Sequence, residues 1–249
     1  MDTMHTMNNN LKDIHSHILY GIDDGSKTLE KSINMLEIAV HNGVSDIILT
    51  PHYIYESVYN CNNEEKKKRF AELQKVVKEK ELPIHLYLGN EIMLCENIVK
   101  LLKKGECMSL NNSRYVLVEL PMHNELLNAK NILFELLKND YIPVLAHPER
   151  YAYLSSDLSF FKEIQEMGVL LQGNYKSLLG KYSKDAKKRL KKMLKNNMIT
   201  FLASDMHHGE SYDLEAAYKK VTKIVKNKTI THQLFVENFD YILYNKEIS

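Results

Sequence analysis

The stretch LKDIHSHILYGIDDGSKTLEKSINMLEIAVHNGVSDIILTPH, residues 11–52, contains one complete strand–helix–strand unit. The short runs Leu11–His15 and Asp46–Thr50 predict strands, and the segment Leu29–Asn42 between them has the apolar period of a helix. Thr28 can cap that helix, because its hydroxyl can accept a hydrogen bond from a backbone N–H of the first turn. Neighbouring strands joined by a helix run parallel, so this unit predicts an α/β fold.

The same alternation continues along the chain. Further candidate strands are Ile84–Gly89, Tyr115–Leu120, Ile142–Ala146, Gly168–Gln172 and Ile199–Ala203. Further candidate helices are Glu64–Lys80, Asn124–Asn139, Ser156–Met167 and Lys184–Asn196. Seven strands without an obvious edge strand favour a closed β/α barrel over an open sheet. No GxGxxG or GxxxxGK[ST] loop occurs, which weakens the nucleotide-binding alternative.

The composition is that of an ordinary globular protein. The 249 residues fit one large domain, residues 1–249, of which residues 1–10 are expected to be a flexible extension. A formal net charge of +1 gives no global field that would attract nucleic acid or anionic lipid. The lysine-rich runs Glu64–Arg69 and Lys184–Lys195 are interpreted as solvated helix faces.

Membrane spans, export signals and cysteine chemistry are not expected. No apolar run approaches the length of a membrane span, and the residues before Leu11 are too polar for a signal peptide. The cysteines Cys61, Cys95 and Cys107 form no CxxC pair, which suits a reducing compartment, and we expect a cytoplasmic protein. None of them is followed six positions later by Arg, which excludes the loop of a cysteine-dependent phosphatase.

Imidazole and carboxylate side chains stand at the ends of six predicted strands. These candidate ligands are His15, His17, His52, Glu91, Glu119, His147, Asp205 and His207. The carboxyl ends of barrel strands converge on one face, so six segments deliver metal-binding groups to one place. Alternate strand residues point to the same side, which lets His15 and His17 hold one ion, and Asp205 and His207 repeat this spacing.

A cluster of divalent metal ions explains this set better than isolated structural histidines do. Acidic groups buried at a shared mouth repel one another unless cations neutralise them. Nitrogen and oxygen ligands without cysteine suit Mn²⁺, Fe²⁺ or Zn²⁺ in a hydrolytic site. Clustered metals activate water and stabilise phosphoryl oxygens, and Arg150 adds a planar fork for phosphate. The sequence therefore predicts a metal-dependent phosphoesterase.

Six motifs carry a family resemblance. They are HSH (residues 15–17), DDG (23–25), TPH (50–52), GNE (89–91), HPER (147–150) and SDMH (204–207). They resemble the polymerase-and-histidinol-phosphatase (PHP) superfamily, and more closely its bacterial manganese-dependent protein-tyrosine phosphatases of capsule and exopolysaccharide operons. The order and spacing agree from about His15 to His207, which is most of the chain.

The resemblance implies a distorted seven-stranded (β/α)7 TIM-like barrel with three metal ions, for which Mn²⁺ is the favoured metal. It implies one ion on His15, His17, Glu91 and Asp205, a second on Glu91, Glu119 and His147, and a third on Asp24, His52 and His207. It also implies that a metal-activated hydroxide attacks the phosphate, which Arg150 positions. The implied substrates are phosphotyrosines in the tail of a tyrosine kinase that regulates capsular or exopolysaccharide synthesis.

Two departures and three alternatives accompany this resemblance. Tyr20 stands where related chains often have Pro. Related chains also tend to have a phosphate-binding Arg a few residues after the last motif, and none follows His207, so either His208 or a nearby Lys replaces it or phosphate binding is weaker or differently tuned. The first alternative is a small-molecule phosphatase of the histidinol-phosphate type, which would use the same metals. The second is a catalytically silent binding module, which is disfavoured because every ligand position is filled, and the third is a nuclease, which the near-neutral charge disfavours.

Aromatic residues beside the motifs bear on the substrate. Tyr20, Tyr53, Tyr55, Tyr151 and Tyr153 follow motif residues and could flank a phenyl ring, which slightly favours phosphotyrosine over histidinol phosphate. The helices also offer faces for a homo-oligomer, although the sequence does not distinguish such faces from core stripes.

Overall fold

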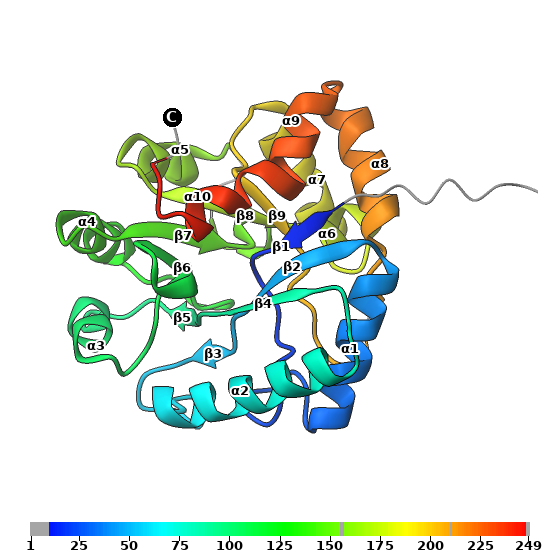
Figure 1. Cartoon of the computed structure of the whole chain (residues 1–249). Coiled ribbons are helices and arrows are strands. Elements are labelled where there is room, and N and C mark those ends of the chain that lie inside the picture. Colours follow the sequence, from blue (N-terminus) through cyan, green and yellow to red (C-terminus); the bar gives the residue numbers. More distant parts are fainter. Residues whose placement is uncertain (1–9, 155–156, 210, 248–249) are drawn as a thin grey trace, which may run out of the picture.

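The computed structural model describes residues 10–154, 157–209 and 211–247 (Figure 1). The strands are β1 Leu11–Asp13, β2 Val44–Leu49, β3 His52–Tyr53, β4 His85–Leu88, β5 Glu91–Met93, β6 Tyr115–Glu119, β7 Ile142–Ala146, β8 Leu170–Asn174 and β9 Phe201–Ala203. The α-helices are α1 Leu29–His41, α2 Asn63–Glu79, α3 Ile98–Lys104, α4 Ala129–Lys138, α5 Ser159–Glu166, α6 Tyr175–Leu179, α7 Lys184–Lys195, α8 Leu214–Val225, α9 Lys228–His232 and α10 Phe239–Leu243. The predicted flexible extension falls on residues 1–9, outside the described ranges, and on Asn10 before β1.

The predicted α/β fold with parallel sheets is confirmed. One sheet has the order β1-β2-β4 and the other the order β3-β5-β6-β7-β8-β9, and every strand pair is parallel. At the ends of the second and third predicted strands the ladder is interrupted, at Thr50-Pro51 and at Gly89-Asn90. A further short strand follows each interruption, β3 and β5, and belongs to the other sheet. Pro51 has no N–H to continue a ladder, which accounts for the first interruption.

Backbone contacts also join the first and last strand regions. Ser16 and Met206 form a parallel bridge, and the Asp205 N–H donates to the carbonyl oxygen of His15 at 2.9 Å. These bonds lie just beyond the carboxyl ends of β1 and β9. They hold the segments that carry His15, His17 and Asp205 side by side.

Hydrophobic packing fills both faces of the strands. All five residues of β6 are buried, as expected for a parallel strand covered on both sides. Phe239 and Ile242 of α10 pack in a separate core cluster with inward residues of the strands, among them Tyr115 and Phe201. The Tyr115 hydroxyl donates to the carbonyl oxygen of Lys246 at 2.5 Å, at the start of β6. The C-terminal segment therefore covers the amino ends of the strands and leaves the carboxyl ends to polar side chains.

Most helix boundaries follow the sequence pattern. Thr28 caps α1 as predicted, because its hydroxyl accepts from the Lys31 N–H at 3.3 Å. The predicted start of a helix at Asn124 is wrong, since α4 begins at Ala129. Leu127 is 91% exposed, so no packing holds a helical turn there.

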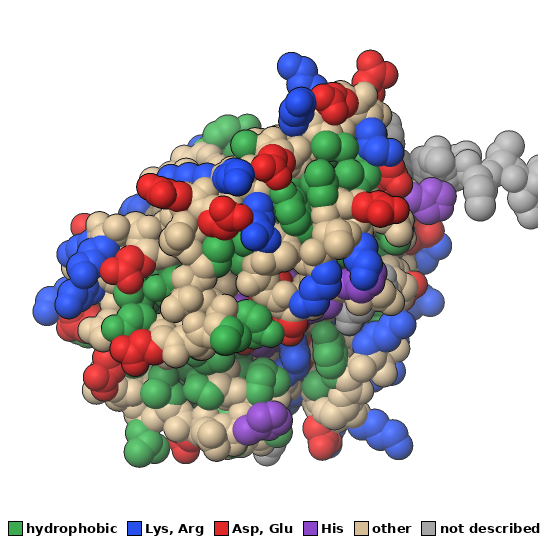
Figure 2. Space-filling model, turned by 90° about the horizontal axis from the view of Figure 1, so that it is seen from below, with side chains coloured by type: hydrophobic (Ala, Val, Ile, Leu, Met, Phe, Trp, Pro, Cys, Tyr) green, Lys and Arg blue, Asp and Glu red, His purple; other side chains and the backbone are tan. Residues whose placement is uncertain are grey.

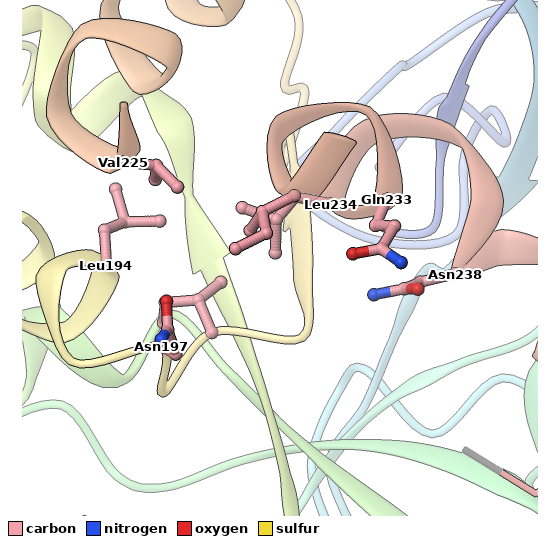
Figure 3. A pocket seen from close by; sticks show the side chains of 8 residues that line it. Leu194, Asn197, Val225, Gln233, Leu234 and Asn238 are labelled. Carbon is pink, nitrogen blue, oxygen red and sulfur yellow. The ribbon is translucent and has the colours of Figure 1, made fainter. Parts of the chain in front are cut away.

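A cavity of about 320 Å³ lies where the C-terminal segment meets the ends of α7 and α8 (Figure 3). Its lining includes Leu194, Asn197, Val225, Gln233, Leu234 and Asn238, and none of its lining residues is charged. Asn197 and the neighbouring Ile199 precede β9, so this cavity faces the amino ends of the strands. It therefore lies apart from the predicted ligands.

The surface carries charges of both signs. Acidic and basic side chains are intermixed on the face shown in Figure 2, with hydrophobic side chains between them. Within the described ranges, no helix combines the length and the apolar character that a membrane span requires.

Tyr212→Phe tests the contacts behind the first strand. The Tyr212 hydroxyl donates to buried Asp13, whose other carboxylate oxygen accepts from the Ser204 N–H at 3.1 Å. We expect Tyr212→Phe to lower the free energy of unfolding by about 1–3 kcal/mol, because a buried carboxylate loses a donor. Urea unfolding measures the change, and Tyr244→Phe, at a side chain 60% exposed, is the control that should have little effect. Equal stability of both variants would contradict a structural role for this bond.

Candidate metal centre

The predicted metal ligands come together at the carboxyl ends of the strands. The first group comprises His15, His17, Glu91 and Asp205, whose ligand atoms lie within 4.8 Å of one another. All four side chains are buried. This is the same set that the resemblance assigns to one ion.

The two histidines of this group face each other with their ε nitrogens. The Nε2 atoms of His15 and His17 are 3.2 Å apart. His15 Nδ1 lies 2.8 Å from Oε1 of Gln172 and His17 Nδ1 lies 2.7 Å from Oδ2 of Asp23, so each Nδ1 is the donor to an oxygen acceptor. In neutral rings the lone pairs of both Nε2 atoms then point at one another. A cation between them removes this repulsion, and the second partners fix each ring as they do in metal sites.

Glu91 connects the first group to a second one, the set of Glu91, Glu119 and His147 that the resemblance assigns to another ion. Its Oε2 lies 3.2 Å from Nε2 of His15 and 3.1 Å from Nδ1 of His52, while its Oε1 lies 2.8 Å from Nε2 of His147. The Glu119 carboxylate lies 3.9 Å from His147 Nε2 and 3.1 Å from His52 Nδ1. The buried Glu91 Oε2 and His52 Nδ1 atoms make no hydrogen bond of acceptable geometry within the described residues. Donor atoms that converge without hydrogen bonding suit a metal ion.

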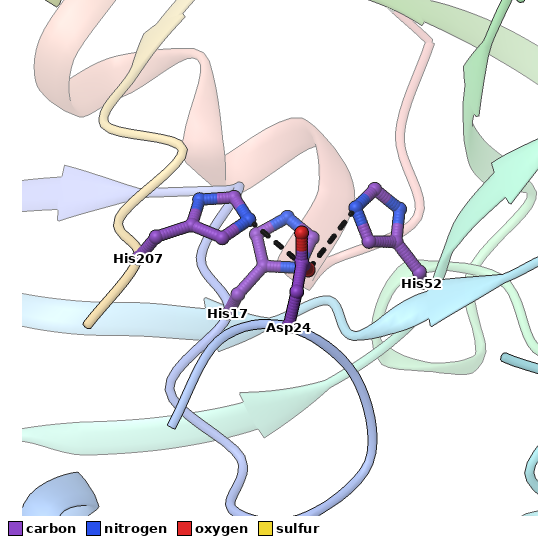
Figure 4. Close-up of side chains that lie close together, drawn as sticks. All are labelled: His17, Asp24, His52 and His207. Carbon is purple, nitrogen blue, oxygen red and sulfur yellow. Dashed lines mark ion pairs between the residues drawn. The ribbon is translucent and has the colours of Figure 1, made fainter. Parts of the chain in front are cut away.

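The third group is formed by Asp24, His52 and His207, together with His17 (Figure 4). Asp24 Oδ1 lies 3.7 Å from Nε2 of His52 and 3.4 Å from Nε2 of His207. The Asp24 side chain is 52% exposed, which places this group at the outer side of the cluster. His52 differs from the expectation, since its Nδ1 faces the second group while its Nε2 faces the third.

Electrostatics holds the buried carboxylates in their charged form. Burial alone would raise the pKa of Glu91, but the charges of His15 and His52 bring it well below its usual range. Burial would likewise raise the pKa of Asp205, but the charge of His15 brings it well below its usual range. Burial opposes the charged form of His52, yet Glu91 and Glu119 raise its pKa to about 9. The cluster is thus an arrangement of anions that requires cations, either protons or metal ions.

Two of the candidate ligands have unusual backbone conformations. His147 has φ 34° and Asp205 has φ 49°, both in the left-handed region that L-residues rarely adopt. Such conformations cluster at functional sites, where the surrounding structure maintains them. Here they turn side chains at the ends of β7 and β9 into the cluster.

Arg150 lies at the edge of the cluster. Its Nη1 donates to Oδ2 of Asp205 at 2.8 Å, and its guanidinium carbon lies 4.5 Å from the ring centre of Tyr182. The ion pair and the ring hold the guanidinium plane beside the first group of ligands. Its remaining N–H groups are the ones that a phosphate could contact.

Sequence reasoning missed several residues that orient the ligands. Asp23 accepts from His17 Nδ1 at 2.7 Å and from the backbone N–H groups of Gly25 and His52, both at 2.9 Å. Gln172 accepts from His15, as described above. Asp23 belongs to the DDG motif and could have been proposed from it. Gln172 ends a predicted strand, but a single amide there carries no specific signal.

A buried lysine supports the interrupted strands. Lys66 is fully buried, and its Nζ donates to Oδ1 of Asn90 at 2.6 Å. Asn90 Nδ2 donates in turn to the carbonyl oxygen of Pro51 at 2.7 Å. Burial lowers the pKa of Lys66 to about 8. Asn90, the residue before Glu91, is therefore tied to Pro51, the residue before His52.

The predicted role of the tyrosines needs correction. Tyr53 and Tyr151 are buried, and the Tyr151 hydroxyl donates to the carbonyl oxygen of Ala146, so both are core residues that cannot flank a substrate ring. Tyr59, which was not predicted, stacks on His52 with ring centres 6.0 Å apart, and Tyr182 packs under Arg150. These two partly exposed residues are aromatic neighbours of the cluster, whereas Tyr151 lies against His147 from the core side, with ring centres 5.6 Å apart.

The cysteines are free thiols without a catalytic environment. Burial raises the pKa of Cys107 to about 12, so this thiol is not a nucleophile near neutral pH. Cys61 and Cys95 are partly buried, and burial raises the pKa of each as well.

Comparison with known proteins agrees with the metal centre. Residues 11–244 match the family of capsular polysaccharide synthesis proteins CpsB/CapC. CapC from Staphylococcus aureus is 35% identical over 195 residues, which cover 78% of this chain and 76% of CapC. The tyrosine-protein phosphatase CpsB from Streptococcus agalactiae is 33% identical over 254 residues, which cover 95% of this chain and 99% of CpsB.

A solved structure is similar over nearly the whole chain. It is one of the crystal structures of YwqE from Bacillus subtilis and CpsB from Streptococcus pneumoniae, which are described as unique metal-dependent tyrosine phosphatases. It matches with a TM-score of 0.85 and 30% identity, and the match covers 96% of each chain. The resemblance read from the six motifs is confirmed, and the chain belongs to the CpsB/CapC family.

Proposed function

We propose that this protein is a metal-dependent protein-tyrosine phosphatase. The observation that carries the proposal is the pair of Nε2 atoms of His15 and His17, which face each other at 3.2 Å beside the Glu91 and Asp205 carboxylates. A cation between the two nitrogens, either a proton or a metal ion, makes this arrangement favourable. Family relatives that are named tyrosine-protein phosphatases support the reaction.

The proposal includes three divalent ions on the three ligand groups described above, with Mn²⁺ as the favoured metal. When bound, such ions lower the pKa of water and stabilise the negative charge of a phosphoryl group. Glu91 faces both inner groups, and His52 faces the second and third groups. Arg150 contributes N–H donors at the edge of the cluster, where it can orient a phosphate.

We infer that the strands form one closed barrel domain. If β2 and β3 are taken as one interrupted strand, and β4 and β5 as another, the nine strands reduce to seven passages of the chain. These seven passages would be neighbours around a ring. The bridge between Ser16 and Met206 supports closure between the first and last passages. A closed ring would bring the ligands of all strand ends to one mouth.

Phosphotyrosine in a protein, including the tail of a tyrosine kinase involved in capsule synthesis, is the proposed substrate. Tyr59 beside His52 and Tyr182 beside Arg150 provide rings near the cluster that can contact a phenyl group. Histidinol phosphate is the alternative, because the same metals would hydrolyse it. Comparing the kcat/KM for a phosphotyrosine peptide with that for histidinol phosphate decides between the two substrates.

Removal and return of metal test the centre directly. We expect chelator-treated protein to be inactive on a phosphotyrosine peptide and Mn²⁺ to restore activity. Mn²⁺ at about 100 times its dissociation constant should also raise the Tm by about 5–10 °C, because only folded protein holds the ligands together. Full activity in the presence of excess chelator, with no metal detected by mass spectrometry, would refute the proposal.

The affinity for Mn²⁺ should depend on pH. The pKa of His52 is about 9 without metal, so this ring is protonated at pH 7 and must lose a proton to bind metal. Asp23 also raises the pKa of His17, against the effect of burial. The apparent affinity should therefore rise from pH 6 to pH 8, with release of protons. Calorimetry in two buffers of different ionisation enthalpy measures that release. A pH-independent affinity would contradict the ligand set.

His147→Ala tests the second ligand group. We expect kcat to fall by roughly 100-fold or more, since a group that faces both Glu91 and Glu119 is lost. His85→Ala, at a side chain 77% exposed on the first residue of β4, is the matched control. Circular dichroism verifies that both variants are folded. Normal turnover by folded His147→Ala would remove His147 from the metal centre.

A further inference from the structure

A basic groove lies between α7 and α8, outside the metal centre. This cavity of about 300 Å³ is lined by the six lysines Lys187, Lys191, Lys195, Lys220, Lys223 and Lys226. Leu178 and Ile224 complete its lining, which contains no carboxylate. We call these six lysines and two apolar residues the lysine groove.

The interpretation of these lysines as a solvated face is incomplete. Helix α7 carries seven basic residues and one acidic residue, whereas the whole chain has a net charge of only +1. Lys187 and Lys220 are partly buried and lie close together across the groove. Burial lowers the pKa of Lys220, and the charges of Lys187 and Lys191 lower it further. Like charges held together in this way are stabilised by an anion.

The groove has the shape of a site for an extended chain. Lys187, Lys191 and Lys195 repeat every four residues and so lie along one side of α7. At 1.5 Å per residue this row is about 12 Å long, the length of about four residues of extended peptide. Leu178 and Ile224 in the same lining offer apolar contacts, which suit a peptide better than a single inorganic ion.

Basic side chains continue from the metal centre to this groove. The Lys176 Nζ donates to the carbonyl oxygen of Asp205 at 3.2 Å. Lys176 and Lys181 line a second cavity of about 300 Å³ beside Gly209. Lys187 Nζ lies 3.8 Å from the position that a Cβ on Gly180 would occupy, next to Lys181. Exposed Lys181 and half-buried Lys187 therefore place basic side chains between the segment that follows Asp205 and the groove.

We propose that the lysine groove binds an acidic segment of the protein substrate while a phosphotyrosine of the same chain occupies the metal centre. This inference rests on the proposed function. The apolar part of the lining favours a polypeptide over nucleic acid, and the lysines that stand between Asp205 and Lys187 favour a segment of the substrate over an anionic membrane. The groove would select substrates mainly through electrostatic attraction at moderate ionic strength.

The test uses Mn²⁺-loaded protein and paired phosphotyrosine peptides. One peptide of each pair carries four consecutive Glu residues, and the other carries Gln at those positions, with spacers of different lengths before the phosphotyrosine. The variant Lys187→Glu/Lys191→Glu/Lys220→Glu changes the groove. The control Lys67→Glu/Lys68→Glu/Lys78→Glu makes the same charge change on exposed positions of α2. A small aryl phosphate reports the activity of the centre itself.

The wild-type protein should hydrolyse the acidic peptide with a kcat/KM about 5- to 10-fold higher than that of its Gln partner at one or more spacer lengths, and salt should reduce this ratio. The groove variant should lose the preference and keep its aryl phosphatase activity, whereas the control should keep both. Equal rates for both peptides in the wild type, or an unchanged preference in the groove variant, would overturn the proposal. So would groove-dependent binding of an RNA oligonucleotide or anionic vesicles without any peptide preference. Failure of the wild type on the aryl phosphate would instead refute the proposed function.

Discussion

The structure depends on the burial of several carboxylates and imidazoles in one small volume. Glu91 is inaccessible to solvent and has ring nitrogens of His15, His17 and His52 within 3.2 Å of one oxygen. Uncompensated burial of such charges would cost several kcal/mol each, which is large against the net stability of a domain. Cations at this point therefore contribute to the fold, and the two parallel sheets can be understood as the frame that positions the candidate ligands.

The frame achieves this by departing from regular strands where the ligands begin. The interruptions before β3 and β5 allow His52 and Glu91 to lie side by side in strands that pair at those two residues. Asn90 replaces the missing ladder bonds by accepting from Lys66 and donating to Pro51. This arrangement explains why Lys66 is buried beside the site, since its ammonium group completes the hydrogen bonds of the Asn90 side chain. Irregular backbone is thus concentrated where a regular sheet could not present the ligands.

The sequence allowed the fold class, the strand ends and the convergence of the candidate ligands to be predicted, because those features depend on local periodicity and on residues that immediately follow apolar runs. It did not allow the two-sheet split or the support from Lys66, since both depend on contacts between segments far apart in the chain. The tyrosines illustrate the same limit. Tyr151 directly follows the HPER motif yet packs in the core, whereas Tyr182 stands 32 residues beyond Arg150 in the sequence and contacts it. Proximity in sequence does not determine the direction of a side chain.

Charge is divided between two environments in this protein. Buried anions around Glu91 face inward and favour metal ions, whereas cations of α7 and α8 face outward and favour anionic polypeptide. Because the chain is nearly neutral as a whole, the positive region must be balanced by acidic residues elsewhere, and long-range attraction is weak while local attraction is strong. A substrate would then be chosen by the position of its acidic residues relative to phosphotyrosine rather than by its total charge. This separation permits the surface to change substrate preference without altering the candidate metal ligands.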